Sequence, residues 1–176
     1  MNDAMPAPDD LAGWKAADRR LLDRFARYLE TNDRPWSARA VNRYFGEDDI
    51  SHFLEEHADQ AVAAAYAAWA VLDYRPTYRS KTQAEKMLEE GLPEPEEMLL
   101  RARMEAVPTI HRIEAHEPKA GTVTLEDVLL GGRVVVNDRL MSENIDDGVF
   151  ICARVFPAGH FRFLELAGPP LGPHMG

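Results

Sequence analysis

Val149-Phe-Ile-Cys-Ala-Arg-Val-Phe156 and Phe161-Arg-Phe-Leu-Glu-Leu166 are the two stretches on which the fold of this chain depends. Both are rich in β-branched and aromatic residues, and Pro157-Ala-Gly159 between them is a turn signal, so together they predict a β-hairpin. Successive side chains of a strand point to opposite faces, and both faces of the first strand are largely apolar. We therefore expect this strand to lie centrally, with one face in the core of the sheet and the other beneath helices.

Three further extended runs precede this hairpin, over Ile110 to Glu117, Gly121 to Leu130 and Arg133 to Asn137. Short turn signals, most of them with glycine, separate the runs. Closely spaced strands joined by tight turns are typical of an antiparallel sheet that can curl into a small barrel. We predict a small antiparallel β-barrel, SH3-like or OB-like, over residues 109–167.

The chain before this region has helical periodicity, and we predict a helical region over residues 1–108. Residues that cap helices occur where the periodic segments begin and end. Ser37 precedes one predicted helix and Gly46 follows it, and Thr82 and Glu85 have the spacing of a capping box before another.

The longest predicted helix begins at Asp48 or Asp49 and ends near Leu72. Its second half, from Ala61, is apolar on nearly every face, as in helices that are buried on all sides. We expect it to be the central helix of a layer that packs on the barrel. The predicted fold class is therefore α+β, with helices and barrel in one folding unit, and residues 168–176, rich in proline and glycine, are expected to be a flexible tail.

The charge balance argues against a general attraction to nucleic acid. The chain has 20 basic and 30 acidic residues, a formal net charge of −10. The acidic excess holds in both parts: 14 basic against 21 acidic residues over 1–108, and six against nine over 109–176. Non-specific binding to phosphate backbones needs the opposite sign. Nucleic acid would require a local groove built from scattered arginines.

The single cysteine, Cys152, excludes an internal disulfide and fits a reducing compartment. No apolar run follows the basic residues near the start, so no signal peptide is expected. The apolar segment Ala61 to Leu72 is too short to cross a bilayer. We predict a cytoplasmic protein without a membrane partner.

The sequence contains no residue pattern typical of a catalytic or metal site. His52 and His57 lie five residues apart in a predicted helix, whereas the metalloprotease helix needs two histidines four apart. His111 and His116 have opposite parity in one predicted strand, which predicts opposite faces. A Gly-rich phosphate loop and a nucleophile elbow are absent. We predict no catalytic residues, no metal and no cofactor, and enzymatic activity is the less favoured class.

One set of polar residues is a candidate binding site. It comprises Asp73, Tyr74, Arg75, Arg133, Asn137, Asp138, Arg139 and Arg154. Small barrels often bind ligands with their strands and loops, and arginine with asparagine can hold a carboxylate or a phosphate. In the alternative interpretation, the acids and arginines form ion pairs that join the helices to the barrel.

Several dispersed segments carry a resemblance to a known family. They are Ala68-Trp69, Asp73-Tyr74-Arg75, Lys81-Thr82, Ile110-His-Arg-Ile-Glu114, Thr124-Leu-Glu-Asp-Val-Leu129, Gly131, Asn137-Asp-Arg139, Ser142 and Asp146-Asp-Gly-Val-Phe-Ile-Cys-Ala-Arg-Val155. Over about residues 60–167 the chain resembles the amino-terminal region of uncharacterised bacterial proteins that usually end in a SEC-C zinc motif. The resemblance implies a helical portion followed by a small β module. The closely spaced cysteines of the zinc motif are missing here, so its metal and its SecB-like partner contacts do not carry over.

These observations favour a non-catalytic protein-binding or adaptor module that acts on another protein or as a homodimer. One alternative is a nucleic-acid-binding protein that uses a local arginine-bearing face of the barrel. Another is a hydrolase with its site at the seam between helices and barrel. An exposed apolar patch would favour a protein partner, a continuous positive groove would favour nucleic acid, and a pocket with converging acids would favour an enzyme.

Overall fold

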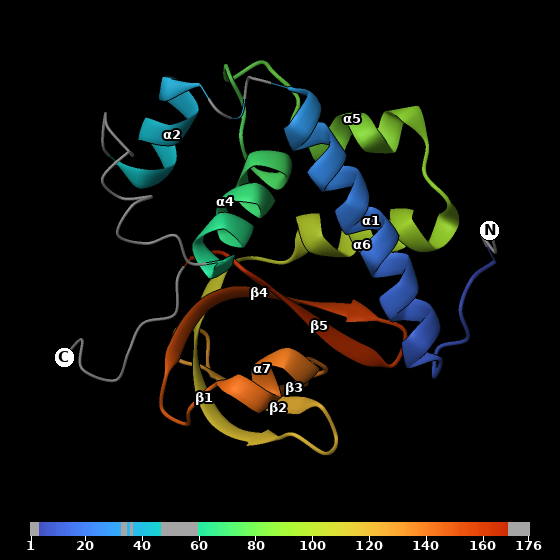
Figure 1. Cartoon of the computed structure of the whole chain (residues 1–176), viewed down its shortest axis with the longest axis vertical. Coiled ribbons are helices and arrows are strands. Elements are labelled where there is room, and N and C mark those ends of the chain that lie inside the picture. The colour runs from blue at the N-terminus through green and yellow to red at the C-terminus, as the bar shows by residue number, and fades with distance from the viewer. Residues whose placement is uncertain (1–3, 33–34, 36, 47–59, 169–176) are drawn as a thin grey trace.

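The computed structural model describes residues 4–32, 35, 37–46 and 60–168. Its helices are α1 (Leu11–Thr31), α2 (Ala38–Phe45), α4 (Gln60–Leu72), α5 (Gln83–Glu90), α6 (Glu94–Glu105) and α7 (Arg139–Asn144). Its strands are β1 (Thr109–Glu117), β2 (Thr122–Asp127), β3 (Arg133–Val136), β4 (Phe150–Ala158) and β5 (Phe161–Leu166). Helices α1, α2, α4, α5 and α6 lie on one side of the sheet, whereas α7 lies beside the strands (Figure 1). The predicted α+β class is confirmed.

The helix ends lie where the local chemistry of the sequence places them. The Ser37 hydroxyl accepts a hydrogen bond from the amide of Ala40 at 3.3 Å, and Gly46 ends α2 with a φ of 77°. Thr82 and Glu85 form the predicted capping box before α5. These bonds satisfy backbone groups that a helix end leaves without partners. The predicted start at Asp48 or Asp49 lies outside the described residues.

The sheet is antiparallel, with strand order β3-β2-β1-β4-β5. The register of β1 against β2 shifts between Ile113 and Ala115, which is a β-bulge. The two outer strands approach each other at one point, where the amide of Asn137 donates to the carbonyl of Arg162 at 2.8 Å. Among the described residues no ladder of hydrogen bonds pairs β3 with β5. The structure therefore shows a five-stranded antiparallel sheet and not a closed barrel.

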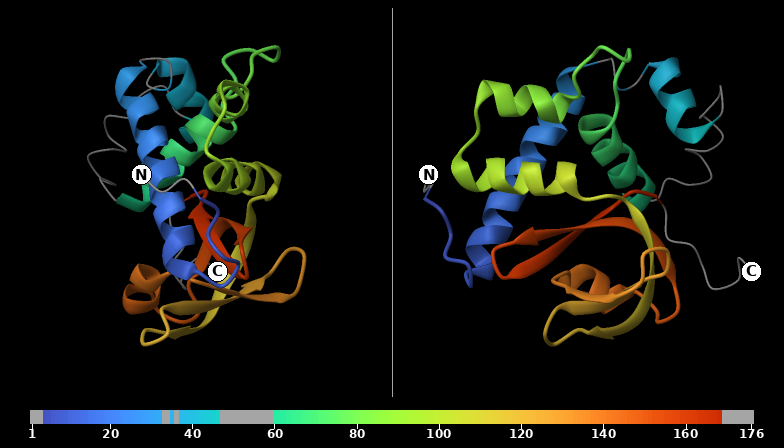
Figure 2. Two further views of the ribbon diagram at one scale, coloured as in Figure 1. Left: turned by 90° about the vertical axis from the view of Figure 1, so that its right-hand side faces the viewer. Right: turned by 180° about the vertical axis from the view of Figure 1, so that it is seen from behind.

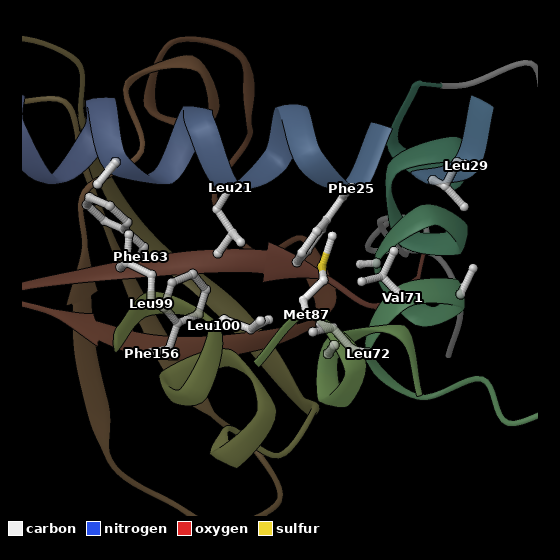
Figure 3. Close-up of a cluster of buried hydrophobic side chains, with 14 of the residues drawn as sticks. Leu21, Phe25, Leu29, Val71, Leu72, Met87, Leu99, Leu100, Phe156 and Phe163 are labelled. Atoms are coloured by element: carbon white, nitrogen blue, oxygen red, sulfur yellow. The ribbon is translucent and has the colours of Figure 1, made fainter. Parts of the chain in front are cut away.

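The predicted central strand, β4, has two buried faces. Ile151 and Ala153 contribute to a core inside the sheet, together with side chains of β1, β2 and β3. Phe156 contributes instead to a larger core shared with the helices. In Figure 3, α1 supplies Leu21 and Phe25 from one side of this second core, and Leu99 and the strands supply the other. The larger core thus contains side chains of both the helices and the strands.

The segment before α1, which contains Ala7 and Pro8, contacts the turn between β4 and β5. The His160 amide donates to the carbonyl of Pro8 at 2.7 Å, and the Trp14 indole donates to the carbonyl of Ala7 at 3.0 Å. Gly159 lies in this contact with a φ of 60°, and a Cβ there would collide with the Pro8 carbonyl and the Trp14 indole. Glycine is required both by the backbone conformation and by the close approach.

Two details of the sequence-based prediction are wrong. The segment Arg139–Asn144 forms helix α7, because Asp138 accepts a hydrogen bond from the amide of Met141 and caps it. The sequence-based prediction has no helix here and includes Asp138 and Arg139 in a candidate binding site. In α6, where apolar residues are expected to face inward, Met98 is exposed and the charged residue Arg103 is buried. The views in Figure 2 show that α7 stands apart from the other helices, on the sheet side of the molecule.

Candidate functional site: a cleft between the helices and the sheet

A cleft of about 870 Å³ lies between α1, α4, α7 and β5. Helices α1 and α4 line it with Leu22, Phe25 and Ala64, and the opposite wall contains Met141 of α7 and Leu164 of β5. Cavities of this size with mainly apolar walls are typical of ligand-binding sites.

Two large apolar side chains of the cleft lining are accessible to solvent. Leu22 of α1 is 42% exposed and Leu140 of α7 is 74% exposed. Single exposed leucines are common on protein surfaces, but here they adjoin an apolar cavity. Apolar surface that is continuous with a cavity favours the burial of another apolar group against it.

A buried cluster of three charged residues contributes to the cleft wall. The Arg103 guanidinium binds Asp18 of α1 at 2.5 Å and Glu165 of β5 at 3.2 Å. It also lies 4.3 Å from the centre of the Phe156 ring, within the range of a cation–π contact. The cluster therefore joins α1, α6 and the β4–β5 hairpin at the seam between helices and sheet.

The charges of this cluster do not cancel. Two carboxylates surround one guanidinium, and both Arg103 Nη1 and Glu165 Oε2 are buried without a hydrogen-bond partner among the described residues. Burial raises the pKa of the Glu165 carboxyl above its usual range, against the opposing effects of Arg103 and Arg154. Buried polar atoms without partners are rare in folded proteins, and they often mark functional positions.

The polar residues predicted from the sequence do not form one site. Asp73 and Arg154 do meet, at 2.5 Å, and this ion pair joins the end of α4 to β4. Tyr74 is buried, with its ring centroid 5.0 Å from that of Trp69. Arg75 instead binds Glu85 at 2.8 Å, in the helical layer.

The remaining four members of the predicted set lie in the β region and have separate partners. Arg133 binds Glu114 at 2.6 Å, and Arg139 binds Glu143 at 2.8 Å. Asn137 contacts Arg162, and Asp138 caps α7. Of the eight residues, Asp138 alone is among those that line the cleft. Among these eight residues, the Asp73–Arg154 pair joins the helices to the sheet, as the alternative interpretation expects, whereas the other ion pairs lie within the helical layer, the sheet or α7.

The sequence analysis missed Asp18, Arg103 and Glu165 because charged residues are ordinarily taken as solvent-exposed. The spacing of residues in the sequence nevertheless indicates that Arg103 faces inward. Leu99 and Leu100 are buried in α6, and residues three or four positions further on lie on the same face of a helix. In β5, Glu165 has the same parity as the buried Phe163.

The histidines of the described part of the chain do not converge. His111 is buried and contacts the hydroxyl of Thr109 at 3.2 Å, whereas His116 contacts Asp147 at 3.1 Å. The bulge in β1 ends strict alternation between these two histidines, so parity alone does not relate their faces. Among the described residues no group of three or more His, Cys, Asp or Glu side chains could hold a metal ion. His52 and His57 lie outside the described residues.

Comparisons with known proteins identify a family but no activity. No helix in the described ranges combines the length and the apolar character needed to span a membrane. Searches of curated proteins and of solved structures gave no match. The sequence model of one family, described as a family of unknown function (DUF7986), matches residues 14–167. That match covers both the helical layer and the whole sheet, and the chain therefore belongs to the DUF7986 family.

Proposed function

We propose that this chain is a non-catalytic binding module that receives an apolar segment of a partner protein in the cleft between its helices and its sheet. The observation that carries the proposal is the open apolar cavity of about 870 Å³ with Leu22 and Leu140 exposed beside it. A cavity of this size accommodates a few side chains of a partner. The exposed leucines extend the contact beyond it.

Charge complementarity indicates what the partner segment looks like. Besides Asp18 and Glu165, the cleft lining includes Asp138 and Asp146, and the whole chain has a net charge of −10. Complementary charges around a binding surface accelerate association and exclude partners of the wrong sign. A basic segment with apolar residues fits this surface best.

Three further aspects of the proposal concern the fold, the location and the ancestry. We propose that the sheet acts as a small barrel of the SH3-like or OB-like kind, which the bond between Asn137 and Arg162 supports. A cytoplasmic location is supported by the single cysteine. The relationship to SEC-C-motif proteins stays a prediction from the sequence segments that resemble them.

The two alternative functions have less support. For nucleic-acid binding, Arg133, Arg139 and Arg154 would have to face a phosphate backbone, and each of them binds a carboxylate. For a hydrolase at the seam, the acids that line the cleft are Asp18, Asp138, Asp146 and Glu165. Asp18 and Glu165 are paired with Arg103, and Asp138 caps α7.

A pair of substitutions on one helix tests the proposal. Ala64 and Ala63 are both exposed on α4, but Ala64 lines the cleft and Ala63 is not among its lining residues. The protein is used to select binders from random peptides displayed on phage, and each selected peptide is then measured against both variants. We expect apolar peptides with basic residues that bind the wild type and Ala63→Trp but not Ala64→Trp. Selected peptides that bind Ala64→Trp as well as the wild type, or a failure to select any peptide, would contradict the proposal.

A further inference from the structure

The charged groups that an occupant of the cleft can reach are carboxylates. The side chain of Asp18 is 20% exposed and that of Glu165 is 10% exposed, whereas the side chain of Arg103 is only 2% exposed. Asp138 and Asp146 add two further carboxylates to the lining. Among its described lining residues, the cleft therefore presents negative charge and keeps the single guanidinium behind it.

Hydrogen bonding of the cluster within the described part of the chain is incomplete. Among the described residues no group donates to Glu165 Oε2, and a buried carboxylate oxygen without a donor is unfavourable. Arg103 Nη1 lacks an acceptor, but its guanidinium already binds two carboxylates and lies over the ring of Phe156. Both atoms are buried, so the charge of the surrounding groups decides, and a positively charged group in the cleft is attracted by the two carboxylates.

We infer that the occupant of the cleft carries a lysine or arginine side chain whose charge is held by Asp18 and Glu165. This inference rests on the proposed function and adds the chemical class of the anchoring group. The aliphatic part of such a side chain lies along the apolar walls while its charged end reaches the carboxylates, as long basic side chains do elsewhere. An incoming carboxylate would instead meet two carboxylates before it reached Arg103, and like charges at this distance repel.

Three small probes with the same alkyl chain and different end groups test the inference. They are n-octylamine, octanol and octanoate, and their binding is measured by titration calorimetry and by amide chemical shifts of the cleft residues. We expect octylamine to bind about tenfold more tightly than octanol, which corresponds to about 1.4 kcal/mol. Octanoate is expected to bind most weakly.

Variants of the two carboxylates separate the charge from the cavity. Glu165→Gln and Asp18→Asn keep the shape of the side chains and should each remove most of the preference for octylamine while octanol binding stays unchanged. Circular dichroism checks that each variant is folded. Asp18 is the more exposed of the two residues, so Asp18→Asn keeps the test valid if Glu165→Gln does not fold.

The pH dependence of binding provides a second readout. Glu165 is faced by Arg103 from α6, Asp18 from α1 and Arg154 from β4, and burial raises its pKa above the usual range. Octylamine stays protonated well above neutral pH, as lysine does with a pKa of about 10.4. Its affinity should therefore increase as the pH rises through the pKa of Glu165, with release of a proton on binding. In Glu165→Gln this increase should disappear.

The possible results separate the inference from the proposed function. Tightest binding of octanoate would identify Arg103 as the anchor and overturn the inference. Equal binding of octylamine and octanol, abolished in Ala64→Trp but kept in Ala63→Trp, would overturn the inference and leave the cleft as a binding site. Binding of all three probes that Ala64→Trp does not change would overturn the proposed function itself.

Discussion

Arg103 shows how tertiary contacts can override the usual placement of a residue type. Its guanidinium is buried at the seam because Asp18, Glu165 and the ring of Phe156 surround it. The spacing within α6 predicts that the residue faces inward, but it does not reveal the two acids, which come from α1 and β5. Pairs of residues far apart in the sequence can be recognised only once the elements are assembled.

Removal of the buried guanidinium should destabilise the protein strongly. In Arg103→Met the buried carboxylate of Glu165 loses its counter-charge, and we expect a loss of about 3–5 kcal/mol in the free energy of unfolding. The double variant Arg103→Met, Glu165→Gln should recover part of this loss because the more deeply buried of the two carboxylates no longer carries a charge, while the more exposed Asp18 remains. Urea unfolding measures both values.

Arg101 provides the matched control for this prediction. It lies on the same helix, is exposed, and pairs with Glu97 one turn away. Arg101→Met should change the free energy of unfolding by less than about 1 kcal/mol. A double variant no more stable than Arg103→Met would show that the cost arises from lost packing and not from an unpaired charge.

His111 should make the stability depend on pH. Burial lowers the pKa of His111 below its ordinary value of 6.5, although Asp127 acts in the opposite direction. Between the folded-state pKa and 6.5 the unfolded chain binds more protons than the folded one, so the free energy of unfolding decreases as the pH falls below about 6.5. Thermal unfolding between pH 5 and 8 should show this decrease in the wild type and a smaller one in His111→Gln. Equal slopes in the two proteins would exclude His111 as its source.

At the scale of elements, local chemistry explains most helix ends. Ser37, Thr82 and Glu85 cap helices with their own side chains, so a short piece of sequence contains the whole signal. Helix α7 was not predicted, and its cap, Asp138, was instead included in the candidate binding site. Helix α4 was predicted from its alanines, and its described part packs against α1, α5 and β5.

Close packing of α4 predicts a strong dependence on side-chain size. Ala70 is buried, and replacement by leucine should cost about 1–3 kcal/mol because the neighbouring elements cannot move away freely. Ala63→Leu on the exposed face of the same helix should change stability by about 0.5 kcal/mol or less. Chemical denaturation of the two variants measures the difference, and equal effects would mean that α4 is loosely packed.

At the scale of the whole molecule, the sequence predicts a common interior but not the cleft. Both faces of β4 are apolar, so each face must be covered by other parts of the protein to be shielded from water. The cleft depends on how far α1 and α4 diverge above β5 and on the position of α7. No short segment of the sequence encodes these distances, so the cavity appears only in the assembled structure.

A destabilising substitution in the sheet should therefore also lower the stability of the helical region. Phe156 is fully buried in the core that β4 shares with the helical layer, and Phe156→Ala should cost about 3–5 kcal/mol. All three tryptophans precede residue 109, so tryptophan fluorescence reports on the helical region. Its unfolding midpoint should shift together with the far-ultraviolet circular dichroism, whereas the exposed substitution Val135→Ala should shift neither by much. Fluorescence that remains native while the sheet unfolds would show two independent units.

The contact between Pro8 and His160 has a consequence for synthesis on the ribosome. Helix α1 is translated well before the β4–β5 hairpin, which supplies its anchor and the phenylalanines that pack on its inner side. Until then the apolar stripe of α1 has no sheet to pack on, and exposed stripes of this kind promote aggregation of nascent chains. Completion of this core must therefore await translation of the β4–β5 hairpin, so the emerging polypeptide would benefit from chaperones that shield α1.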